Sequence, residues 1–187
     1  MAKAMENLDE RLTQAVRKFW RTRKAQREKQ RDEGAERDRG ARSAVTGKAQ
    51  LDGVIRLVED ILEENGLPEA DIYRERTDRS SVTIPGYFRP TKEWDLLVVA
   101  DGSLVATIEF KSQVGPSFGN NFNNRTEEAL GSATDLWTAY REGVYPESPR
   151  PWLGYFMLLE DAPDSRRPIR VKEPHFEVSD VFHDASY

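Results

Sequence analysis

The chain has 187 residues, of which 33% are charged and 37% hydrophobic, and its formal net charge is -5. This length can bury a core of its own, and the lack of cysteine excludes disulfides, thiol chemistry and cysteine-ligated zinc. A multi-histidine metal site is disfavoured because His175 and His183 are the two histidines. No apolar run has membrane-spanning length and the amino terminus lacks a signal-peptide pattern, so we expect a cytoplasmic protein without a membrane partner.

Charge is distributed unevenly along the chain. Residues 1–50 hold 14 Lys and Arg against 8 Asp and Glu, whereas residues 51–187 hold 14 against 25. An acidic domain is no obvious DNA ligand, but its acids can bind metal ions that meet phosphates. The basic segment could add attraction for DNA or could be a solvated helix. We therefore divide the chain into a charged helical arm, residues 1–47, and a core, residues 48–187.

Apolar residues at three- and four-residue spacing predict a helix over residues 6–39, whose first half docks on the protein through one face. From residue 21 onward this helix has almost no apolar side chains, and we expect it to extend into solvent or to be poorly ordered. Residues 40–47 are expected to form a loop. A second amphipathic helix is predicted over residues 49–66, where Gly66 ends it.

The centre of the chain is rich in strand signals. Residues 80–88 predict a strand that reaches a turn at Pro85-Gly86. Residues 93–100 and 103–111 flank Asp101-Gly102, which is a strong hairpin signal.

The last third of the chain adds a helix and a strand. Residues 124–143 predict the helix, and the apolar run 152–161 predicts a central strand buried on both faces. Residues 162–187 are loop-like. The order predicts a mixed α/β (α+β) fold, with a small mixed sheet flanked by helices and the helical arm in front.

Side-chain alternation in the hairpin can place two acids on one face. Glu109 and Lys111 are two residues apart and share a face, with Phe110 on the other. A three-residue loop at residues 100–102 makes Asp95 a diagonal neighbour of Glu109, about 7–8 Å away. A two-residue loop would split the acids between the faces, so the pattern favours the longer loop or a bulge of the same effect. The opposite face is then wholly apolar: Trp94, Leu96, Val98, Ala100, Leu104, Ala106, Ile108 and Phe110.

Two carboxylates and an ammonium at one end of a sheet suit metal-assisted phosphodiester hydrolysis. Close carboxylates repel one another unless a cation lies between them, and hard oxygen ligands favour Mg²⁺. Lys111 could orient the attacking water and stabilise charge that develops on a phosphate. The alternative is a surface ion pair between Glu109 and Lys111, with Asp95 ending a strand.

The pattern of Asp95 with Glu109-Phe110-Lys111 resembles the signature of the PD-(D/E)xK nucleases, although Trp94 replaces the usual proline. The stretches IPGYFRPTKEWDLLVV and KSQVGPSFGNNFNNRTEEALGSATDLW are similar to the XhoI-type type II restriction endonucleases. The similarity runs from about Val16 to Tyr187.

This resemblance implies a homodimeric, Mg²⁺-dependent enzyme with a PD-(D/E)xK core. Its partner is double-stranded DNA, cut at a palindrome that is CTCGAG in the best-known members. It also implies a cognate DNA methyltransferase in the host, though not as a stable partner. Family members are expected to continue past the position of Tyr187, so we expect a truncated form that lacks part of the DNA-reading or dimerising surface.

The resemblance also implies a site. Asp95, Glu109 and the backbone carbonyl of Phe110 would bind the metal, and Lys111 would be the catalytic lysine. Members of the superfamily often add a glutamate from the first core helix, for which Glu59 or Glu63 are candidates. For both, a solvated helix face is the alternative.

Candidate DNA contacts surround the acid pair in sequence: Gln113, Asn120, Asn121, Asn123, Asn124 and Arg125 for base edges, and Arg89 and Lys92 for phosphates. Asn and Gln can pair with adenine and Arg with guanine, while phosphate contacts position the duplex. The asparagines could instead cap turns, with Asn124 as a helix N-cap and Glu127 completing a capping box. Glu127 and Glu128 are interpreted as acids at the N-terminal helix dipole.

Two further functions stay open. A repair or recombination nuclease of the same superfamily would share the catalytic residues but cut by DNA structure. A catalytically silent DNA-binding module would use the amino-terminal helix as a partner-binding arm. Retention of all three catalytic residue types argues against the silent module.

Overall fold

The computed structural model describes residues 7–32, 39–74, 79–146, 149–173 and 175–187, and for residues 29–32, 39–48, 70 and 79 it describes the backbone alone. The helices are α1 (Leu8–Asp32), α2 (Arg39–Glu64) and α3 (Phe118–Arg141), and the strands are β1 (Ile72–Arg74), β2 (Thr83–Pro85), β3 (Thr91–Glu93), β4 (Leu96–Ala100), β5 (Ser103–Gln113) and β6 (Trp152–Leu159). Short 3-10 segments cover Glu69–Asp71, Arg79–Val82 and Asp180–Phe182. The predicted mixed α/β fold is confirmed.

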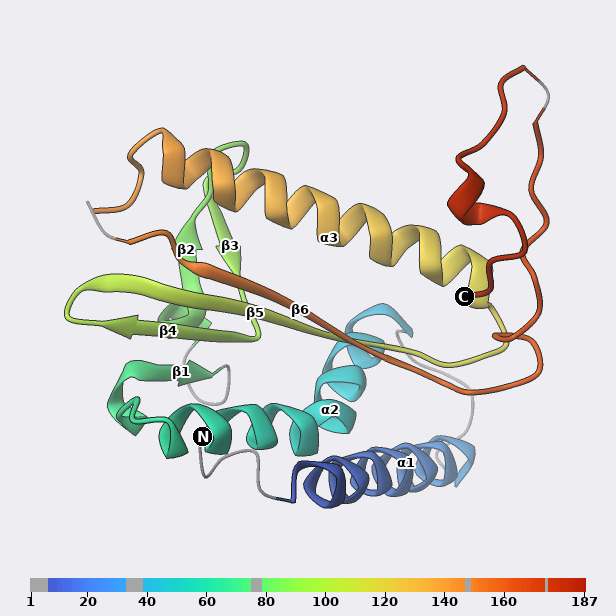
Figure 1. Cartoon of the computed structure of the whole chain (residues 1–187). Helices are drawn as coiled ribbons and strands as arrows, with labels where there is room; N and C mark the ends of the chain where they lie inside the picture. The colour runs from blue at the N-terminus through green and yellow to red at the C-terminus, as the bar shows by residue number, and fades with distance from the viewer. Residues whose placement is uncertain (1–6, 33–38, 75–78, 147–148, 174) are drawn as a thin grey trace.

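The described strands form a four-stranded mixed sheet in the order β1-β4-β5-β6 and a separate two-stranded sheet, β2-β3. β5 and β6 run parallel, with α3 as the crossover between them, and the other pairs are antiparallel. Figure 1 shows α1 and α2 below the large sheet and α3 above it, with β2 and β3 between the sheet and one end of α3. No described helix is long and apolar enough to cross a membrane.

The larger core lies between the sheet and the two amino-terminal helices. Its buried members are Ala15, Phe19, Leu51, Val54, Ile55, Leu57, Leu96, Val98, Ala106, Ile108, Phe110 and Leu158. Ala15 and Phe19 come from the predicted docking face of the first helix, so that prediction is confirmed. Buried residues follow the helical period on α1 and α2, as expected for helices with one apolar face. On β4, Leu96, Leu97 and Val98 are all buried, because both faces of this strand are covered.

The β4–β5 hairpin turns through two residues rather than three. Asp101 and Gly102 both have positive φ, 50° and 74°, and Ala100 pairs with Ser103. Two positive φ values are typical of the tight turn that matches strand twist. The predicted three-residue loop is therefore wrong, whereas the alternative prediction, a bulge of the same effect, is confirmed.

A β-bulge restores the side-chain arrangement that the longer loop was expected to give. The register changes between Val98 and Val99, so Val105 of β5 is the extra residue. Beyond the bulge the two strands pair regularly. Extending that register by one residue, past the start of β4, places Asp95 opposite Glu109. The two acids therefore share a face, directly opposite one another rather than diagonally.

Two members of the predicted apolar face, Leu104 and Trp94, lie on the other side of the sheet. Leu104 pairs with Val99, and both belong with Leu97 to the second core on the α3 side of the sheet. Trp94 lies in this second core too, because β4 begins after it and strand alternation no longer applies. The second core consists of Val82, Trp94, Leu97, Leu104 and Leu136 with partly buried neighbours.

Several predicted boundaries are wrong. Residues 40–47 are helical and belong to α2, so the proposed division at residue 47 falls inside a helix, and an independent arm stays a prediction. α1 continues as a helix to Asp32, and residues 33–38 of the predicted first helix lie outside the described part. The predicted strand 80–88 shrinks to β2 after a 3-10 turn.

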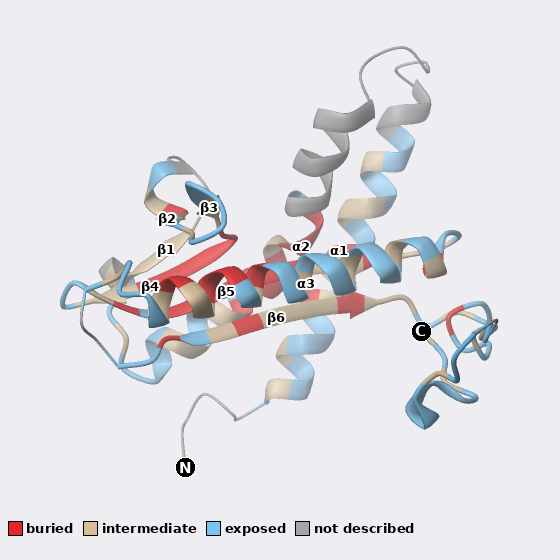
Figure 2. Cartoon of the chain, turned by 90° about the horizontal axis from the view of Figure 1, so that it is seen from above, coloured by how far each residue is buried: buried red, intermediate tan, exposed pale blue. Residues whose placement is uncertain are grey.

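β6 is an edge strand of the described sheet, not a central strand. Its first residue, Trp152, is 60% exposed, and most of the strand is half-buried. Figure 2 shows this intermediate burial along β6, in contrast to the buried β4 and β5. An apolar run indicates contact on both faces but does not reveal whether another strand lies beside it.

Replacing Phe19 by Ala should lower the free energy of unfolding by about 3–5 kcal/mol, because its side chain is fully buried between α1, α2 and the sheet. Leu12→Ala, on the same helix but 39% exposed, should cost less than about 1.5 kcal/mol. Urea unfolding followed by circular dichroism measures both. Equal small losses would mean that α1 is a solvated arm after all.

Candidate active site

The three predicted catalytic side chains converge on the α3 side of the sheet. Asp95 directly precedes β4, while Glu109 and Lys111 lie on β5. Lys111 Nζ is 2.8 Å from Glu109 Oε2 and 4.0 Å from Asp95 Oδ2. The carboxyl groups are both buried, and Asp95 Oδ2 accepts a hydrogen bond from the Phe110 N–H at 2.8 Å. The expected gathering of these groups on one face is therefore observed, and their catalytic roles stay predictions.

Lys92 adds a second ammonium to this cluster. Its Nζ forms an ion pair with Glu109 Oε1, the oxygen that Lys111 leaves free. Lys92 comes from β3, so the small sheet contributes directly to the site. Its Nζ lies 4.4 Å from the ring centroid of Trp94, a cation–π contact that fixes the lysine over a buried aromatic ring. Glu109 is thus held between two lysines from different sheets.

The two acids respond in opposite ways to this environment. Burial, together with the charge of Glu109, raises the pKa of Asp95 above its ordinary value, although Phe110 N–H and Lys111 act against the rise. Burial also acts to raise the pKa of Glu109, but Lys111 and Lys92 outweigh it and the pKa is lowered. The cluster therefore keeps Glu109 ionised and disfavours a second negative charge on Asp95. An additional cation beside both groups would relieve that repulsion.

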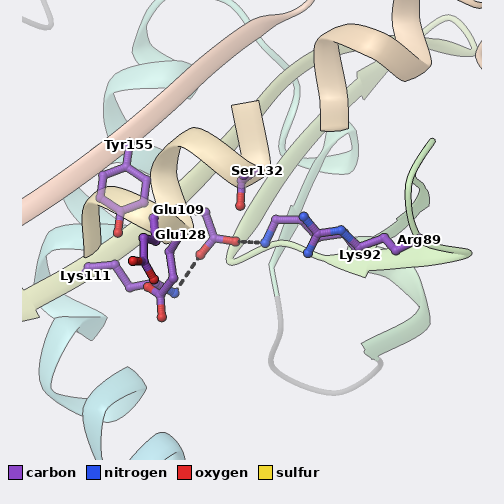
Figure 3. A pocket seen from close by; sticks show the side chains of 9 residues that line it. Arg89, Lys92, Glu109, Lys111, Glu128, Ser132 and Tyr155 are labelled. Atoms are coloured by element: carbon purple, nitrogen blue, oxygen red, sulfur yellow. Dashed lines mark hydrogen bonds and ion pairs between the residues drawn. The ribbon is translucent and has the colours of Figure 1, made fainter. Parts of the chain in front are cut away.

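A cavity of about 450 Å³ opens beside the cluster. It is lined by Arg89, Lys92, Glu109, Lys111, Glu127, Glu128, Gly131, Ser132 and Tyr155. These residues come from the β2–β3 hairpin, β5, β6 and α3. Figure 3 shows the side chains of Lys111, Glu128 and Tyr155 gathered around Glu109, with Lys92 approaching from the other side. Three basic and three acidic side chains line the cavity, so their formal charges cancel.

Asp135 of α3 fixes the hairpin that carries Lys92. Its Oδ1 accepts hydrogen bonds from the N–H groups of Tyr87 and Phe88, at 2.9 and 2.8 Å, and its Oδ2 pairs with Arg89 Nε at 2.9 Å. Gly86 lies so close that an added Cβ would meet Asp135 Oδ2 at 2.5 Å. Burial opposes the charge on Asp135, but the hydrogen bonds from Phe88 and Tyr87 and the charge of Arg89 lower its pKa. Arg89, predicted to bind phosphate, thus also has a structural partner.

The structure does not bring the candidate extra metal ligand to the acid pair. Glu59 lies on α2, across the sheet from Asp95, and its Oε2 pairs with Arg74 Nη1 of β1 at 3.0 Å. Glu63 lies on the same helix. Sequence spacing could not show which face of the sheet α2 would cover. Within the described residues, no group of three or more His, Asp or Glu side chains is arranged to hold a metal ion.

The asparagine-rich segment is helical rather than a loop. α3 begins at Phe118, so Asn124 is not an N-cap, and Glu127 and Glu128 lie in its third turn rather than its first. Gly and Asn are poor helix formers, which favoured a loop on propensity. Tertiary contacts override this, because Phe118 is buried and Tyr187 packs on Gly119.

The predicted base-reading residues have different surroundings in this helix. Asn120, Asn123 and Asn124 are exposed and share a helix face with Glu127, which lines the cavity. Asn123 Nδ2 donates to Glu127 Oε1 at 2.9 Å.

Three other candidates face inward or are paired. Asn121 is half-buried, and Arg125 Nη1 lies 2.5 Å from Glu128 Oε2. Gln113 is 1% exposed, and its Nε2 donates to the Phe118 carbonyl at 2.7 Å. In this structure Gln113 holds the start of α3, so it is not on a surface that DNA can reach.

A family model for restriction endonuclease XhoI matches residues 29–187. The chain belongs to the XhoI restriction endonuclease family. It is 51% identical over 179 residues to the type II restriction enzyme AbrI of Azospirillum brasilense, covering 96% of this chain and 78% of that protein. Identity is 49% over 156 residues to BstVI of Geobacillus stearothermophilus, with coverages of 81% and 68%. Identity is 45% over 174 residues to XhoI of Xanthomonas vasicola, with coverages of 92% and 67%. No solved structure matches the chain.

Four cavity or support residues of this XhoI-family chain escaped the sequence reasoning: Glu128, Ser132, Asp135 and Tyr155. The three on α3 follow the helical period that leads from the asparagines to the cavity, but a helix start after residue 123 hid that relation. Tyr155 lies within an apolar run and carried no signal of its own. Only the parallel pairing of Glu109 with Tyr155 shows that this tyrosine lies beside the acid cluster.

Replacing Asp135 by Asn should lower the free energy of unfolding by about 2–3 kcal/mol at neutral pH, since the amide cannot accept from Arg89 as the carboxylate does. The pKa of Asp135 is lowered in the folded state, so its contribution is full above its ordinary pKa and is lost as pH falls through the folded value. The difference between the variant and the parent should therefore shrink on acidification. Chemical unfolding across the acidic range measures it, with Asp164→Asn, an exposed partner of Arg167, as the unaffected control.

The acid pair predicts opposite effects of two similar substitutions in protein treated with a chelator. Asp95→Asn should stabilise by about 1 kcal/mol, because it removes a buried charge that the fold disfavours. Glu109→Gln should destabilise by about 2 kcal/mol or more, because Lys92 and Lys111 lose their counter-charge. Thermal unfolding of both variants decides this. Loss of stability in both would contradict the assignment of the firmly ionised group to Glu109.

Proposed function

We propose that this protein is a Mg²⁺-dependent type II restriction endonuclease that hydrolyses duplex DNA at a specific palindrome, CTCGAG by family resemblance. The observation that carries the proposal is the convergence of Asp95, Glu109 and Lys111 beside a cavity that Glu109 and Lys111 line. This is the acid and acid-x-lysine arrangement of the PD-(D/E)xK nucleases. Membership of the XhoI family supports site-specific cleavage of DNA as the reaction.

The donor set of the site fits Mg²⁺. Two adjacent buried carboxylates provide hard oxygen ligands, and burial together with the charge of Glu109 raises the pKa of Asp95, a repulsion that a cation would relieve. Asp95, Glu109 and the carbonyl of Phe110 are the residues that would hold the ion. When bound, Mg²⁺ would supply Lewis acidity and positive charge toward a phosphodiester. The cavity lining itself has no net formal charge, so the ion would also make the site attractive to an anionic substrate.

The chain's own basic groups have separate tasks in this proposal. Lys111 lies beside both acids, where its ammonium can orient the attacking water and stabilise the charge on the phosphate. In hydrolysis the water oxygen forms a bond to phosphorus while the bond from phosphorus to the leaving sugar oxygen breaks, and that oxygen takes up a proton. Lys92 and Arg89, on the hairpin held by Asp135, would receive flanking phosphate oxygens in addition to their present partners, Glu109 and Asp135.

Sequence reading is assigned to the exposed amide face of α3. Asn120, Asn123 and Asn124 present donors and acceptors that fit base edges, and their helix face leads to the cavity. Arg125 would have to leave Glu128 to reach a guanine. A palindromic site requires two copies of this face related by a two-fold axis, so a homodimer is part of the proposal. A host methyltransferase that protects the same site is a further implication of the restriction function.

Incubating plasmid DNA with the protein and Mg²⁺ should produce discrete fragments, and sequencing their ends should give one palindrome with uniform cuts. Lys111→Ala should reduce the rate by about a thousandfold, because it removes a charge at the reacting phosphate. Exposed Lys172→Ala serves as the control with unchanged rate.

Other outcomes separate the alternatives. Diffuse degradation would indicate a general or structure-specific nuclease, and a gel shift without cutting would indicate a DNA-binding module. Lys111→Ala protein that cuts as fast as its parent would remove the role assigned to that lysine.

A further inference from the structure

Tyr155 lines the cavity but makes none of the ion pairs or hydrogen bonds that hold the acid cluster together. It lies on β6, where the parallel register pairs it with Glu109 on β5. Both side chains therefore project to the α3 side of the sheet from neighbouring strands. Figure 3 shows the Tyr155 ring above the cluster, with its hydroxyl directed toward Glu109, Glu128 and Lys111.

The Tyr155 hydroxyl is buried and has no hydrogen-bond partner among the described groups. A buried tyrosine hydroxyl usually finds one, because an unpaired buried polar group costs stability. Tyr145 illustrates the usual case, since its hydroxyl donates to the Pro85 carbonyl at 2.6 Å. The Tyr155 hydroxyl, unpaired beside the acid cluster, is therefore available as a hydrogen-bond donor to a ligand.

The surroundings define what this donor can bind. Burial and the nearby charges of Glu128, Glu109 and Asp95 raise the pKa of Tyr155 to about 12, and the charge of Arg125 reduces that rise. The hydroxyl is therefore a neutral donor at any pH at which DNA is cut. Lys92 and Lys111 pair with Glu109, whereas the Tyr155 hydroxyl has no such pairing and can donate to an oxygen acceptor of the substrate without breaking one.

We infer that Tyr155 is a further catalytic residue of this site, whose hydroxyl donates a hydrogen bond to a non-bridging oxygen of the scissile phosphate. The inference rests on the proposed nuclease function and adds a substrate contact to it. It follows from the pairing of Tyr155 with Glu109, from its place in the cavity wall and from its buried, unpartnered hydroxyl. This bond strengthens as negative charge develops on the phosphate oxygens during hydrolysis.

Tyr155→Phe tests the inference because it removes one oxygen and leaves the ring. The cleavage rate at saturating DNA and Mg²⁺ should fall roughly tenfold to a hundredfold. Affinity for uncut duplex, measured with Ca²⁺ in place of Mg²⁺, should change by less than about threefold, because the bond matters most in the transition state. The thermal midpoint should stay equal or rise slightly, since the variant loses an unsatisfied polar atom. A merely structural tyrosine would give the reverse pattern, with lower stability and an unchanged rate.

Tyr73→Phe provides the matched control. Tyr73 lies on β1, is partly buried on the same side of the sheet and is not part of the cavity lining. Its substitution should leave the cleavage rate unchanged. Comparing the two variants therefore separates the effect of losing the hydroxyl in the cavity from the general effect of replacing a tyrosine by phenylalanine.

A substrate with a single methylphosphonate at the cut position identifies the acceptor. The diastereomer that replaces the contacted oxygen by a methyl group should slow the parent, and Tyr155→Phe should then add little further loss, because both changes remove the same bond. Full additivity with both diastereomers, or a Tyr155→Phe protein that cuts as fast as the parent, would overturn the inference. A parent protein that cuts no duplex would instead refute the proposed function, and this inference with it.

Discussion

The site depends on one electrostatic constraint, which is the burial of two carboxyl groups side by side. Like charges in a poorly solvated environment repel strongly, so the fold must neutralise one of them or bring a cation. It does so asymmetrically. Glu109 receives two ammonium groups and ionises readily, whereas Asp95 receives one backbone N–H and a more distant lysine and resists ionisation. Full ionisation of both acids is therefore costly to the fold, and this is the feature on which the proposed role of a divalent cation rests.

The backbone feature that creates this constraint is the bulge in β5. A two-residue turn without a bulge would have set the acids on opposite faces, since side chains alternate strictly along a strand. The extra residue, Val105, shifts the parity by one and brings Asp95 opposite Glu109. The same shift changes which face of the sheet the side chains take on the two sides of the bulge. The hairpin therefore contributes side chains to both cores. One local irregularity thus decides the site and the packing above it.

The groups around the acids come from elements that are distant along the chain. β3 brings Lys92, β6 brings Tyr155, and α3 brings the glutamates and the asparagine face. Asp135 links the hairpin to α3 through three hydrogen bonds, so the hairpin that carries Lys92 and the helix that carries the asparagine face are directly connected. In an XhoI-family enzyme this linkage would couple the reading of a DNA sequence to the position of the groups that cut it.

The sequence by itself determined the mixed α/β class, the docking face of α1 and the pair of strands that carry Asp95 and Glu109-x-Lys111. These follow from hydrophobic periodicity and from the Asp101-Gly102 turn, which are local properties. Only the tertiary structure decided the length of α3, the edge position of β6, the far-side location of Glu59 and the inward orientation of Gln113. Each depends on contacts between distant segments, such as Tyr187 on Gly119 or Arg74 with Glu59, and such contacts leave no local pattern in the chain.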